Sequence, residues 1–247
     1  MQTQEYATLR AVEDHHWWYG ILHDLVNREL RGRLPAAAHV LDAGCGTGGT
    51  MSRLRQEHPE WLLEGIDLDG DAVHMTQARG LQNIRQGTLN ELPYASATFD
   101  VILGLDVLYH QSVDEDRALD EMTRVLKPGG VLLLNLPAFE SLRGSHDVAV
   151  CGARRYKACQ VRDLLENRNL SIEMIHYWNA WLFLPLLFMR QWSRLGTGHH
   201  GASDLQMPPY WLNAALMAVG QADARICRVS GLPFGSSIFA VAIKPAN

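Results

Sequence analysis

A glycine-rich segment from Asp42 to Gly49 carries the residue types best suited to hold a cofactor. Its glycines would let backbone N–H groups approach a bound molecule without interference from side chains. Gly44, Gly46 and Gly49 also match the G-x-G-x-x-G spacing of dinucleotide sites, a match that is weak on its own. Asp42 precedes the first glycine, where a carboxylate would repel a pyrophosphate and would suit the ammonium group of an amino-acid cofactor.

A second carboxylate, Asp67, ends the next apolar run. At this position in a βαβ unit a carboxylate can accept hydrogen bonds from both ribose hydroxyls of a nucleoside. NAD-binding sites share that feature, so Asp67 indicates a nucleoside without choosing between cofactors. The chain then closes on a predicted strand hairpin, residues 171–177 with 237–243, instead of a second mononucleotide-binding half. The hairpin and Asp42 together favour a sulfonium cofactor, S-adenosylmethionine, over NAD.

The segments that must position these residues alternate between short apolar runs and polar helical stretches, which is the pattern of βαβ units on a parallel sheet. The predicted strands are His39–Asp42, Leu62–Asp67, Ile84–Gly87, Asp100–Leu105, Val131–Leu136, Ser171–Tyr177 and Ser237–Ile243. The predicted helices are Glu5–Asp14, Ile21–Leu30, Gly48–Glu57, Gly70–Arg79, Glu115–Leu126, Gln160–Asn167, Trp178–Trp192 and Tyr210–Val229. We therefore predict a Rossmann-like α/β fold with a seven-stranded, mostly parallel sheet whose last strand is antiparallel.

Four segments resemble, in their order and spacing, the motifs of class I S-adenosylmethionine-dependent methyltransferases. They are Val40–Gly48 (motif I), Glu64–Asp69 (the acidic second strand), Phe99–His110 (the fourth strand and the turn after it) and Val125–Gly130 (the helix end before strand five). A strand-ending aspartate or a glycine turn can also be plain punctuation between a strand and a helix. Four such segments in register favour the family, which implies S-adenosylmethionine as cofactor and S-adenosylhomocysteine as product.

The resemblance assigns roles to individual residues around the glycine turn. It implies that Asp42 and the backbone of Gly44, Cys45 and Gly46 hold the methionine part of the cofactor. It implies that Asp67 holds the ribose.

The resemblance also assigns the adenine side of the cofactor. Leu68 would pack on the adenine, and Leu105, at the end of the fourth strand, would face the methionine end. This sequence departs from the family at Thr88, where an aspartate commonly accepts a hydrogen bond from the adenine amino group. The Thr88 hydroxyl can accept that bond more weakly, with the backbone of Leu89 completing the contact. The departure bears on affinity and leaves the identity of the cofactor unchanged.

Two histidines are candidate catalytic bases, because an acceptor whose nucleophile carries a proton must lose it. His110 follows the fourth predicted strand, and His146 follows the fifth, beside Asp147. Both would lie at the carboxyl edge of the sheet, next to the cofactor. His110 is equally consistent with a packing residue, and the His146–Asp147 pair acts as an oriented base only where the two side chains face each other.

An aromatic segment near the N-terminus, Glu13–Tyr19, resembles an E-D-x-H-W-W element found in a subgroup of bacterial methyltransferases. Ser145–Asp147, Arg154–Tyr156 and Leu232–Ser237 resemble later elements of that subgroup. The aromatic segment is either a lid that contacts cofactor and acceptor or a staple that fixes the N-terminal helices to the core. The arginines could bind a carboxylate or phosphate on the acceptor. The residues assigned to the acceptor are His16, Trp17, Trp18, Tyr19, Arg154, Arg155 and Tyr156.

Composition narrows the class of protein. The 247 residues are 47% hydrophobic and 20% charged, with a net charge of −5, which is typical of a globular protein and argues against a nucleic-acid partner. The four cysteines lack zinc or disulfide spacing, so we predict reduced thiols, no metal site and a cytoplasmic location. The apolar stretch 178–189 is too short to span a bilayer. It favours a pocket roof or homodimer surface over a lipid contact.

These observations predict one domain over residues 1–247, with a helical lid at 1–34, a cofactor-binding core at 35–137 and an acceptor-side region at 138–247 that contains a helical insert at 178–230. The predicted activity is methyl transfer to an oxygen or nitrogen of a small molecule, such as a specialised metabolite. The alternatives are a lipid-linked or sugar acceptor at a membrane surface, a cofactor-binding scaffold without catalysis, and an NAD-dependent oxidoreductase.

Overall fold

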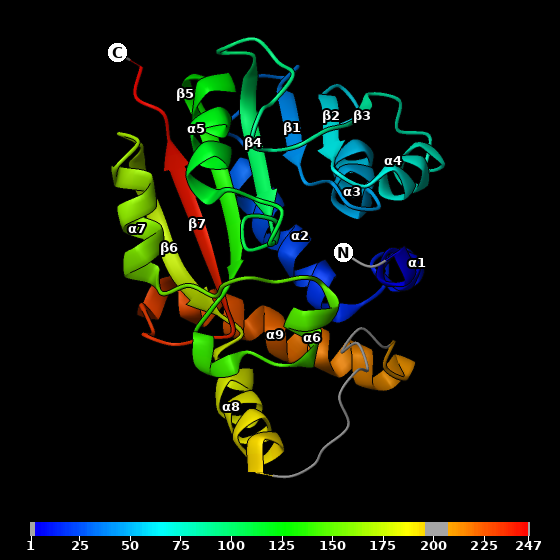
Figure 1. The fold of residues 1–247 in the computed structure, drawn as a ribbon, viewed down its shortest axis with the longest axis vertical. Helices are drawn as coiled ribbons and strands as arrows, with labels where there is room; N and C mark the ends of the chain where they lie inside the picture. The colour runs from blue at the N-terminus through cyan, green and yellow to red at the C-terminus, as the bar shows by residue number, and fades with distance from the viewer. Residues whose placement is uncertain (1–2, 196–206, 247) are drawn as a thin grey trace.

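A computed structural model describes residues 3–195 and 207–246, and its centre is a seven-stranded sheet (Figure 1). The strand order is β3-β2-β1-β4-β5-β7-β6. The strands are β1 (His39–Ala43), β2 (Leu62–Asp67), β3 (Ile84–Gln86), β4 (Phe99–Leu105), β5 (Leu126–Pro137), β6 (Ser171–Trp178) and β7 (Ser237–Ile243). The first five run parallel, and β7 lies antiparallel between β5 and β6. The predicted Rossmann-like fold and its closing hairpin are confirmed.

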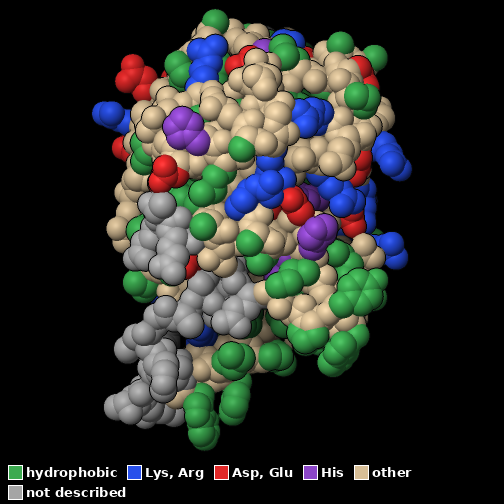
Figure 2. All heavy atoms as spheres, turned by 90° about the vertical axis from the view of Figure 1, so that its right-hand side faces the viewer, with side chains coloured by type: hydrophobic (Ala, Val, Ile, Leu, Met, Phe, Trp, Pro, Cys, Tyr) green, Lys and Arg blue, Asp and Glu red, His purple; other side chains and the backbone are tan. Residues whose placement is uncertain are grey.

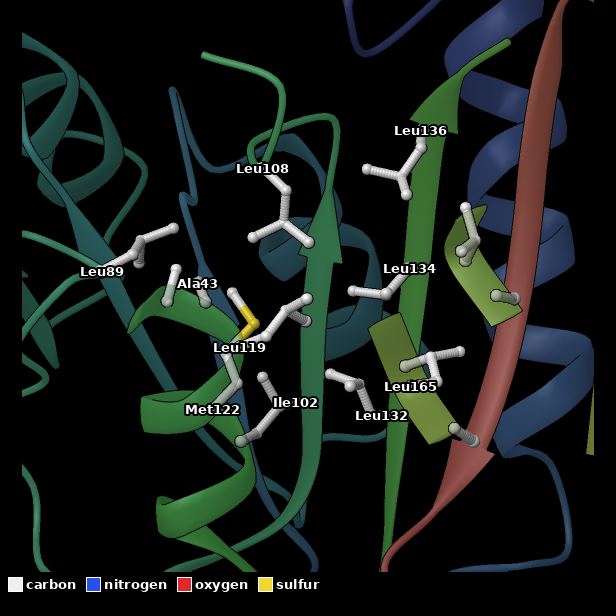
Figure 3. Close-up of a cluster of buried hydrophobic side chains, with 14 of the residues drawn as sticks. Ala43, Leu89, Ile102, Leu108, Leu119, Met122, Leu132, Leu134, Leu136 and Leu165 are labelled. Atoms are coloured by element: carbon white, nitrogen blue, oxygen red, sulfur yellow. The ribbon is translucent and has the colours of Figure 1, made fainter. Parts of the chain in front are cut away.

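Both faces of the sheet are buried, because neighbouring residues of a strand point to opposite sides. In β5, Leu132 and Leu134 belong to one hydrophobic cluster, and Val131 and Leu133 belong to the other. Figure 3 shows the first cluster, where the sheet meets α5 (Glu115–Val125) and α7 (Ala158–Glu166). The second cluster packs against α2 (Trp17–Leu30), α3 (Gly49–Glu57), α4 (Gly70–Gln77) and α9 (Tyr210–Ser230). This double burial explains the unbroken apolar runs in the sequence.

Several helices gather at the carboxyl edge of the parallel strands, the edge at which ligands bind in such sheets. They are α1 (Thr3–Val12), α6 (Ser145–Ala149), α8 (Ala180–Leu195) and the adjoining part of α9 (Figure 1). Helix α8 contacts α9 and the short turn Glu140–Leu142, and it projects away from the sheet. Of the helices that the structure describes, none combines the length and the apolar character needed to cross a bilayer.

The segment after β6 differs from its predicted structure. Trp178 ends β6 instead of beginning a helix, and its Nε1–H donates to Oδ1 of Asn135 at 2.9 Å. A buried indole N–H needs such a partner, and Asn135 supplies it only when Trp178 continues the strand. Asn179 then adopts a φ of 56° and α8 begins at Ala180. Residues 196–206 of the insert predicted at 178–230 lie outside the described residues.

Candidate active site

A cavity of about 730 Å³ opens at the carboxyl edge of the sheet. Its lining starts with residues at the ends of β1, β2 and β4 and continues through α1, α2, α6 and α8. β1 and β4 are neighbours whose connections leave toward opposite faces of the sheet, so a crevice forms where they end. Every residue predicted to hold the cofactor lines it, namely Asp42, Gly44, Cys45, Gly46, Asp67, Leu68, Thr88, Leu89 and Leu105.

The glycine turn after β1 is fixed between two other segments. The backbone N–H groups of Gly44 and Cys45 donate to the carbonyl oxygen of Ile66 at 2.8 and 3.1 Å. Gly44 has a φ of 88°, and a Cβ at this position would collide with the Val107 side chain. Glycine satisfies both the left-handed conformation and the lack of space. The turn therefore forms a rigid wall of the cavity between β2 and the segment after β4.

Asp67 is oriented by three donors. Its Oδ2 accepts a hydrogen bond from the N–H of Gly46 at 2.9 Å, and its Oδ1 accepts one from the N–H of Asp69 at 3.0 Å. The hydroxyl of Tyr6, in α1, also donates to Oδ1 at 3.3 Å. Burial raises the pKa of Asp67, and these hydrogen bonds act in the opposite direction. The carboxylate is thus held at the cavity wall, where paired hydroxyl groups can donate to it.

Asp42 is a deeply buried carboxylate at the same end of the cavity, with an exposure of 4%. Its pKa is raised to about 7, first by burial and then by the negative charges of Asp67 and Glu13. Three carboxyl groups therefore meet at one end of the cavity. A ligand that brings positive charge would relieve their mutual repulsion. This end fits the ammonium and sulfonium groups of S-adenosylmethionine.

The residues expected on the adenine side lie near β2 and β3. Leu89 is buried and Leu68 is exposed, and both line the cavity together with Thr88. The Thr88 hydroxyl oxygen accepts a hydrogen bond from the N–H of Asn90 at 3.2 Å. A hydroxyl has one donor and two acceptor positions, so this bond orients the Thr88 side chain and leaves capacity for a second partner.

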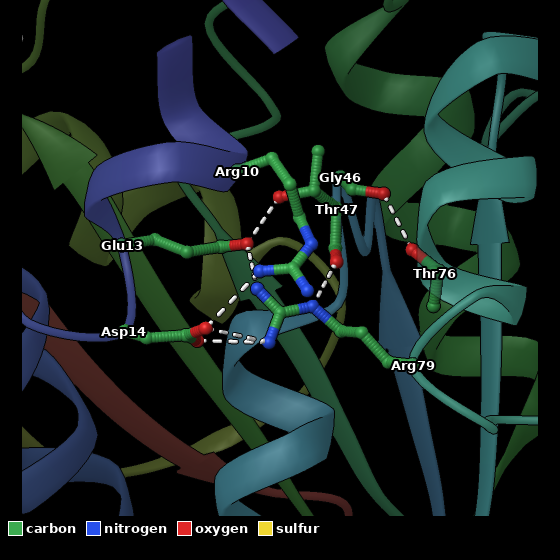
Figure 4. Close-up of polar contacts among 7 residues, drawn as sticks. All are labelled: Arg10, Glu13, Asp14, Gly46, Thr47, Thr76 and Arg79. Atoms are coloured by element: carbon green, nitrogen blue, oxygen red, sulfur yellow. Dashed lines mark hydrogen bonds and ion pairs between the residues drawn. The ribbon is translucent and has the colours of Figure 1, made fainter. Parts of the chain in front are cut away.

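A cluster of charged residues fastens the N-terminal helix to the glycine turn (Figure 4). Arg79 forms ion pairs with Glu13 and Asp14, and its Nε–H donates to the carbonyl oxygen of Thr47 at 2.7 Å. The Thr47 hydroxyl donates to Glu13. The side chains of Arg79 and Glu13 are only 5% and 6% exposed. We name Glu13, Asp14, Thr47 and Arg79 the N-terminal clasp; it gives the Glu-Asp pair of the E-D-x-H-W-W element a structural role.

The aromatic segment after the clasp is both a packing element and part of the cavity. His16, Trp17, Trp18 and Tyr19 all line the cavity. Trp18 also stacks on Trp178, with ring centroids 5.4 Å apart. The segment therefore fastens α2 to the core and also forms part of the cavity wall.

The two candidate histidines both line the cavity. Burial lowers the pKa of His110 to about 4, and its ring is hydrogen-bonded by backbone groups of Val150 and Asp106. His110 is thus a neutral ring held by backbone groups, and its role as a base or as a packing residue stays a prediction.

Asp147, the neighbour of His146 in the chain, is paired with another residue. Its carboxylate accepts hydrogen bonds from Arg155 at 2.7 and 3.1 Å and from the N–H of Gly144 at 2.8 Å. Burial alone would raise the pKa of Asp147, but the Arg155 guanidinium outweighs it and the pKa is lowered. Arg155 is therefore a partner that neutralises this aspartate.

Three consecutive residues assigned to the acceptor point to different places. Arg155 lines the cavity beside Asp147. Arg154 forms an ion pair with Glu115 at 3.6 Å, and the hydroxyl of Tyr156 donates to the same carboxylate. Neither Arg154 nor Tyr156 is among the residues that line the cavity. Both side chains hold their segment against α5 through Glu115, and their assignment to acceptor binding stays a prediction.

Known proteins with similar sequences decide the family. The family model for methyltransferase domains matches residues 41–134. A probable S-adenosylmethionine-dependent methyltransferase of Mycolicibacterium smegmatis is 30% identical over 169 residues, which make up 67% of this chain and 64% of that protein. The chain belongs to the class I S-adenosylmethionine-dependent methyltransferases.

Other similar proteins carry names with different activities or substrates. A probable tRNA methyltransferase 9B of Mus musculus is 38% identical over 117 residues, covering 47% of this chain and 25% of that protein. The matches thus span less than two thirds of the length of either relative. The crystal structure of the [4+2]-cyclase SpnF has the same fold, with a TM-score of 0.60 and 24% identity over 92% of this chain and 81% of that one.

Membership of the class I methyltransferases makes S-adenosylmethionine the methyl donor, and the acidic end of the cavity fits it. The cofactor supplies an activated methyl group and leaves as a neutral thioether. In this chain Asp42 would face the ammonium group and Asp67 the ribose hydroxyls, as the family pattern implies.

Among the cavity residues that were not predicted, Tyr6 and Asp106 bear most directly on the site. Tyr6 reaches Asp67 from α1, a contact between distant parts of the sequence that no local pattern signals. Asp106 follows the last residue of β4 and lines the cavity. Asp106 could have been predicted from the sequence, because a carboxylate directly after a parallel strand lies at the ligand-binding edge of the sheet.

Proposed function

We propose that this chain transfers the methyl group of S-adenosylmethionine to an oxygen or nitrogen atom of a small organic molecule, such as a specialised metabolite. The cavity carries this proposal. Its volume of about 730 Å³ lies within the range of small-molecule sites, roughly 300–1,000 Å³. Its lining combines the carboxyl groups suited to the cofactor with the aromatic side chains of α2. Such rings suit the flat or apolar body of a small acceptor.

Charge argues against a nucleic-acid acceptor, although a tRNA methyltransferase is among the relatives. Surfaces that bind nucleic acid are basic, whereas this chain has a net charge of −5. Arg155, at the acceptor end of the cavity, is already neutralised by Asp147. A small neutral or cationic acceptor therefore fits the site better than a phosphate backbone.

Helix α8 supports a second candidate, a lipid-linked or sugar acceptor at a membrane surface. Leu182 and Leu186 line the cavity, whereas Leu184, Phe188 and Met189 are exposed. Figure 2 shows hydrophobic side chains gathered at the lower end of one face of the molecule. Helix α8 thus presents apolar side chains both to the cavity and to the surface, where an apolar acceptor could bind.

Transfer of a labelled methyl group distinguishes these acceptors. The protein would be incubated with methyl-labelled S-adenosylmethionine and one of three pools: small amines, phenols and alcohols; polyprenyl-linked sugars in phosphatidylglycerol vesicles; or transfer RNA. We expect label in the first pool. Label confined to the vesicles would favour the second candidate, and label confined to transfer RNA would contradict the proposal. Binding of S-adenosylhomocysteine without label in any pool would indicate a non-catalytic scaffold.

A further inference from the structure

We propose that Asp106 takes up the proton that the acceptor loses when it is methylated. This inference rests on the proposed function and deepens it, because a hydroxyl or amine nucleophile needs such a group. Asp106 lines the cavity together with Leu105 and Val107 on either side of it. Val107 lies against Gly44 of the glycine turn, so Asp106 sits beside the end of the cavity suited to the methionine part of the cofactor.

The backbone of Asp106 is held in a costly conformation. Its φ is 51°, a left-handed value that is uncommon for a residue with a side chain and that persists where the surroundings enforce it. The enforcing partner is Asn135 of β5, whose carbonyl oxygen accepts a hydrogen bond from the Asp106 N–H at 2.9 Å. A residue strained in this way at the wall of a cavity is one whose side-chain direction matters.

A buried relay fixes one oxygen of the Asp106 carboxylate. The side-chain amide of Asn135 donates to Oδ2 of Asp106 at 2.7 Å, and its own Oδ1 accepts the Nε1–H of Trp178 at 2.9 Å. Asn135 and Trp178 are fully buried, so the relay cannot rotate freely. The relay engages Oδ2, and Oδ1 is the oxygen assigned to take the proton from a bound acceptor.

The groups around Asp106 come from several elements. Burial and then the negative charge of Asp106 raise the pKa values of Tyr19 in α2 and of Tyr109. The ring of His110 forms a hydrogen bond with the backbone of Asp106. Arg155 lies close enough to stabilise the ionised form of Asp106. Burial raises the pKa of Asp106 to about 7, and Asn135 and Arg155 act against this shift. A carboxyl group that exchanges its proton near neutral pH is well matched to general-base catalysis.

The proton transfer balances as follows. The O–H or N–H bond of the acceptor breaks, its proton moves to Oδ1 of Asp106, and the electron pair released forms the bond to the methyl carbon. The electrons of the broken carbon–sulfur bond return to sulfur, and Asp106 later releases the proton to water. A carboxylate acceptor has no such proton at neutral pH, and Asp106 would repel it. The geometry therefore points to hydroxyl or amine acceptors.

The first experiment needs no acceptor. The aspartate carboxyl groups of the wild-type protein, labelled with ¹³C, would be titrated by NMR in the complex with S-adenosylhomocysteine and again with sinefungin, which carries an ammonium group in place of the neutral sulfur. D106N, which keeps the shape of the side chain, identifies the resonance. We expect Asp106 to titrate near neutral pH in the first complex and at lower pH in the second. Titration below pH 5 in the first complex, or equal titration in both, would overturn the proposal.

Binding of the same two ligands gives a second readout. D106N should weaken the affinity for sinefungin about tenfold, because the ammonium group of sinefungin loses its attraction to the Asp106 carboxylate, an effect equivalent to roughly one pKa unit. The affinity of D106N for S-adenosylhomocysteine should stay within about twofold of the wild-type value. D163N, at an exposed position on α7, is the matched control and should change neither affinity. An equal loss for both ligands in D106N would assign Asp106 a purely structural role.

The titration and the binding measurements need no acceptor, so they test the role of Asp106 independently of the proposed function. The proposed function fails when no small molecule in the first pool is methylated. With a methylated amine or phenol in hand, D106N should lower the transfer rate at least about 100-fold. The wild-type rate should rise with pH through an apparent pKa near neutrality, and D106N should lose that rise. A wild-type rate in D106N would overturn the assignment.

Discussion

The hydroxyl of Tyr6, in the N-terminal helix, donates a hydrogen bond to Oδ1 of Asp67 at the end of β2, across 3.3 Å. Asp67 is also the residue proposed to receive the ribose hydroxyls of the cofactor. One carboxylate therefore serves both the docking of α1 and the binding of the ligand. Because the two share a partner, we expect the position of α1 and the occupancy of the cofactor end to be coupled.

Replacing Tyr6 with phenylalanine should lower the free energy of unfolding of the ligand-free protein by about 1 kcal/mol, the typical net contribution of a hydrogen bond. Urea denaturation followed by circular dichroism measures this change. Tyr210→Phe, at a position that is 89% exposed, is the matched control and should leave the unfolding curve in place. Identical curves for Tyr6→Phe and wild type would show that the contact with Asp67 contributes nothing.

The N-terminal clasp predicts a larger loss on removing its cation. Arg79→Met leaves Glu13 buried without a partner charge, which should cost about 3–5 kcal/mol of unfolding free energy. Arg10→Met is the control, because the Arg10–Asp14 pair is 40% and 39% exposed and such pairs contribute about 1 kcal/mol or less. Chemical denaturation of both variants compares them. Equal losses would mean that the clasp behaves as an ordinary surface network.

Asp42 predicts a pH dependence of stability. Its pKa in the folded protein, about 7, lies above the value near 4 of an unfolded chain. The stabilising contribution of the protonated form is therefore complete below about pH 4 and is lost as the pH rises toward 7. Asp42→Asn should remove this loss and raise the thermal midpoint of the ligand-free protein at pH 8. A lower midpoint at pH 8 would contradict the sign.

Ligand affinity should follow the opposite trend. The ammonium group of S-adenosylhomocysteine pairs with the ionised form of Asp42, so its affinity should rise about tenfold between pH 6 and pH 8 for a group that titrates near 7. Isothermal titration calorimetry at several pH values measures the profile. Asp42→Asn should bind more weakly and with a flat profile. A flat profile in the wild-type protein would separate Asp42 from the ammonium group.

Asp67→Ala should weaken the binding of S-adenosylhomocysteine by about 2 kcal/mol or more, roughly 30-fold, because two charge-assisted hydrogen bonds to the ribose are lost. Calorimetry reports the affinity, and the thermal midpoint checks that the glycine turn, which Asp67 also contacts through Gly46, remains folded. Asp71→Ala, at an exposed position in the first turn of α4, should change affinity less than threefold. Unchanged binding in Asp67→Ala would remove this residue from the site.

Local patterns were sufficient to predict the framework of the molecule and the cofactor end of its cavity. The apolar runs that became β1, β2, β4 and β5 are each a few residues long and bounded by turn residues, and such patterns depend mainly on neighbouring side chains. Asp42 is the next-to-last residue of β1 and Asp67 is the last residue of β2, and the carboxyl ends of parallel strands share one edge. The positions of Asp42 and Asp67 in the sequence were therefore enough to predict that both line the cavity.

The acceptor end depended on contacts between residues far apart in the sequence. Arg154 and Arg155 are adjacent and chemically alike, yet they have different partners. Arg155 pairs with Asp147 at the cavity wall, whereas Arg154 pairs with Glu115 outside the cavity. Asp106 faces the cavity because Asn135, on a neighbouring strand, holds its left-handed backbone. The sequence alone determined the sheet, the glycine turn and the methyl donor. Only the tertiary structure decided which charged side chains line the cavity, because that choice depends on partners supplied by other strands and helices.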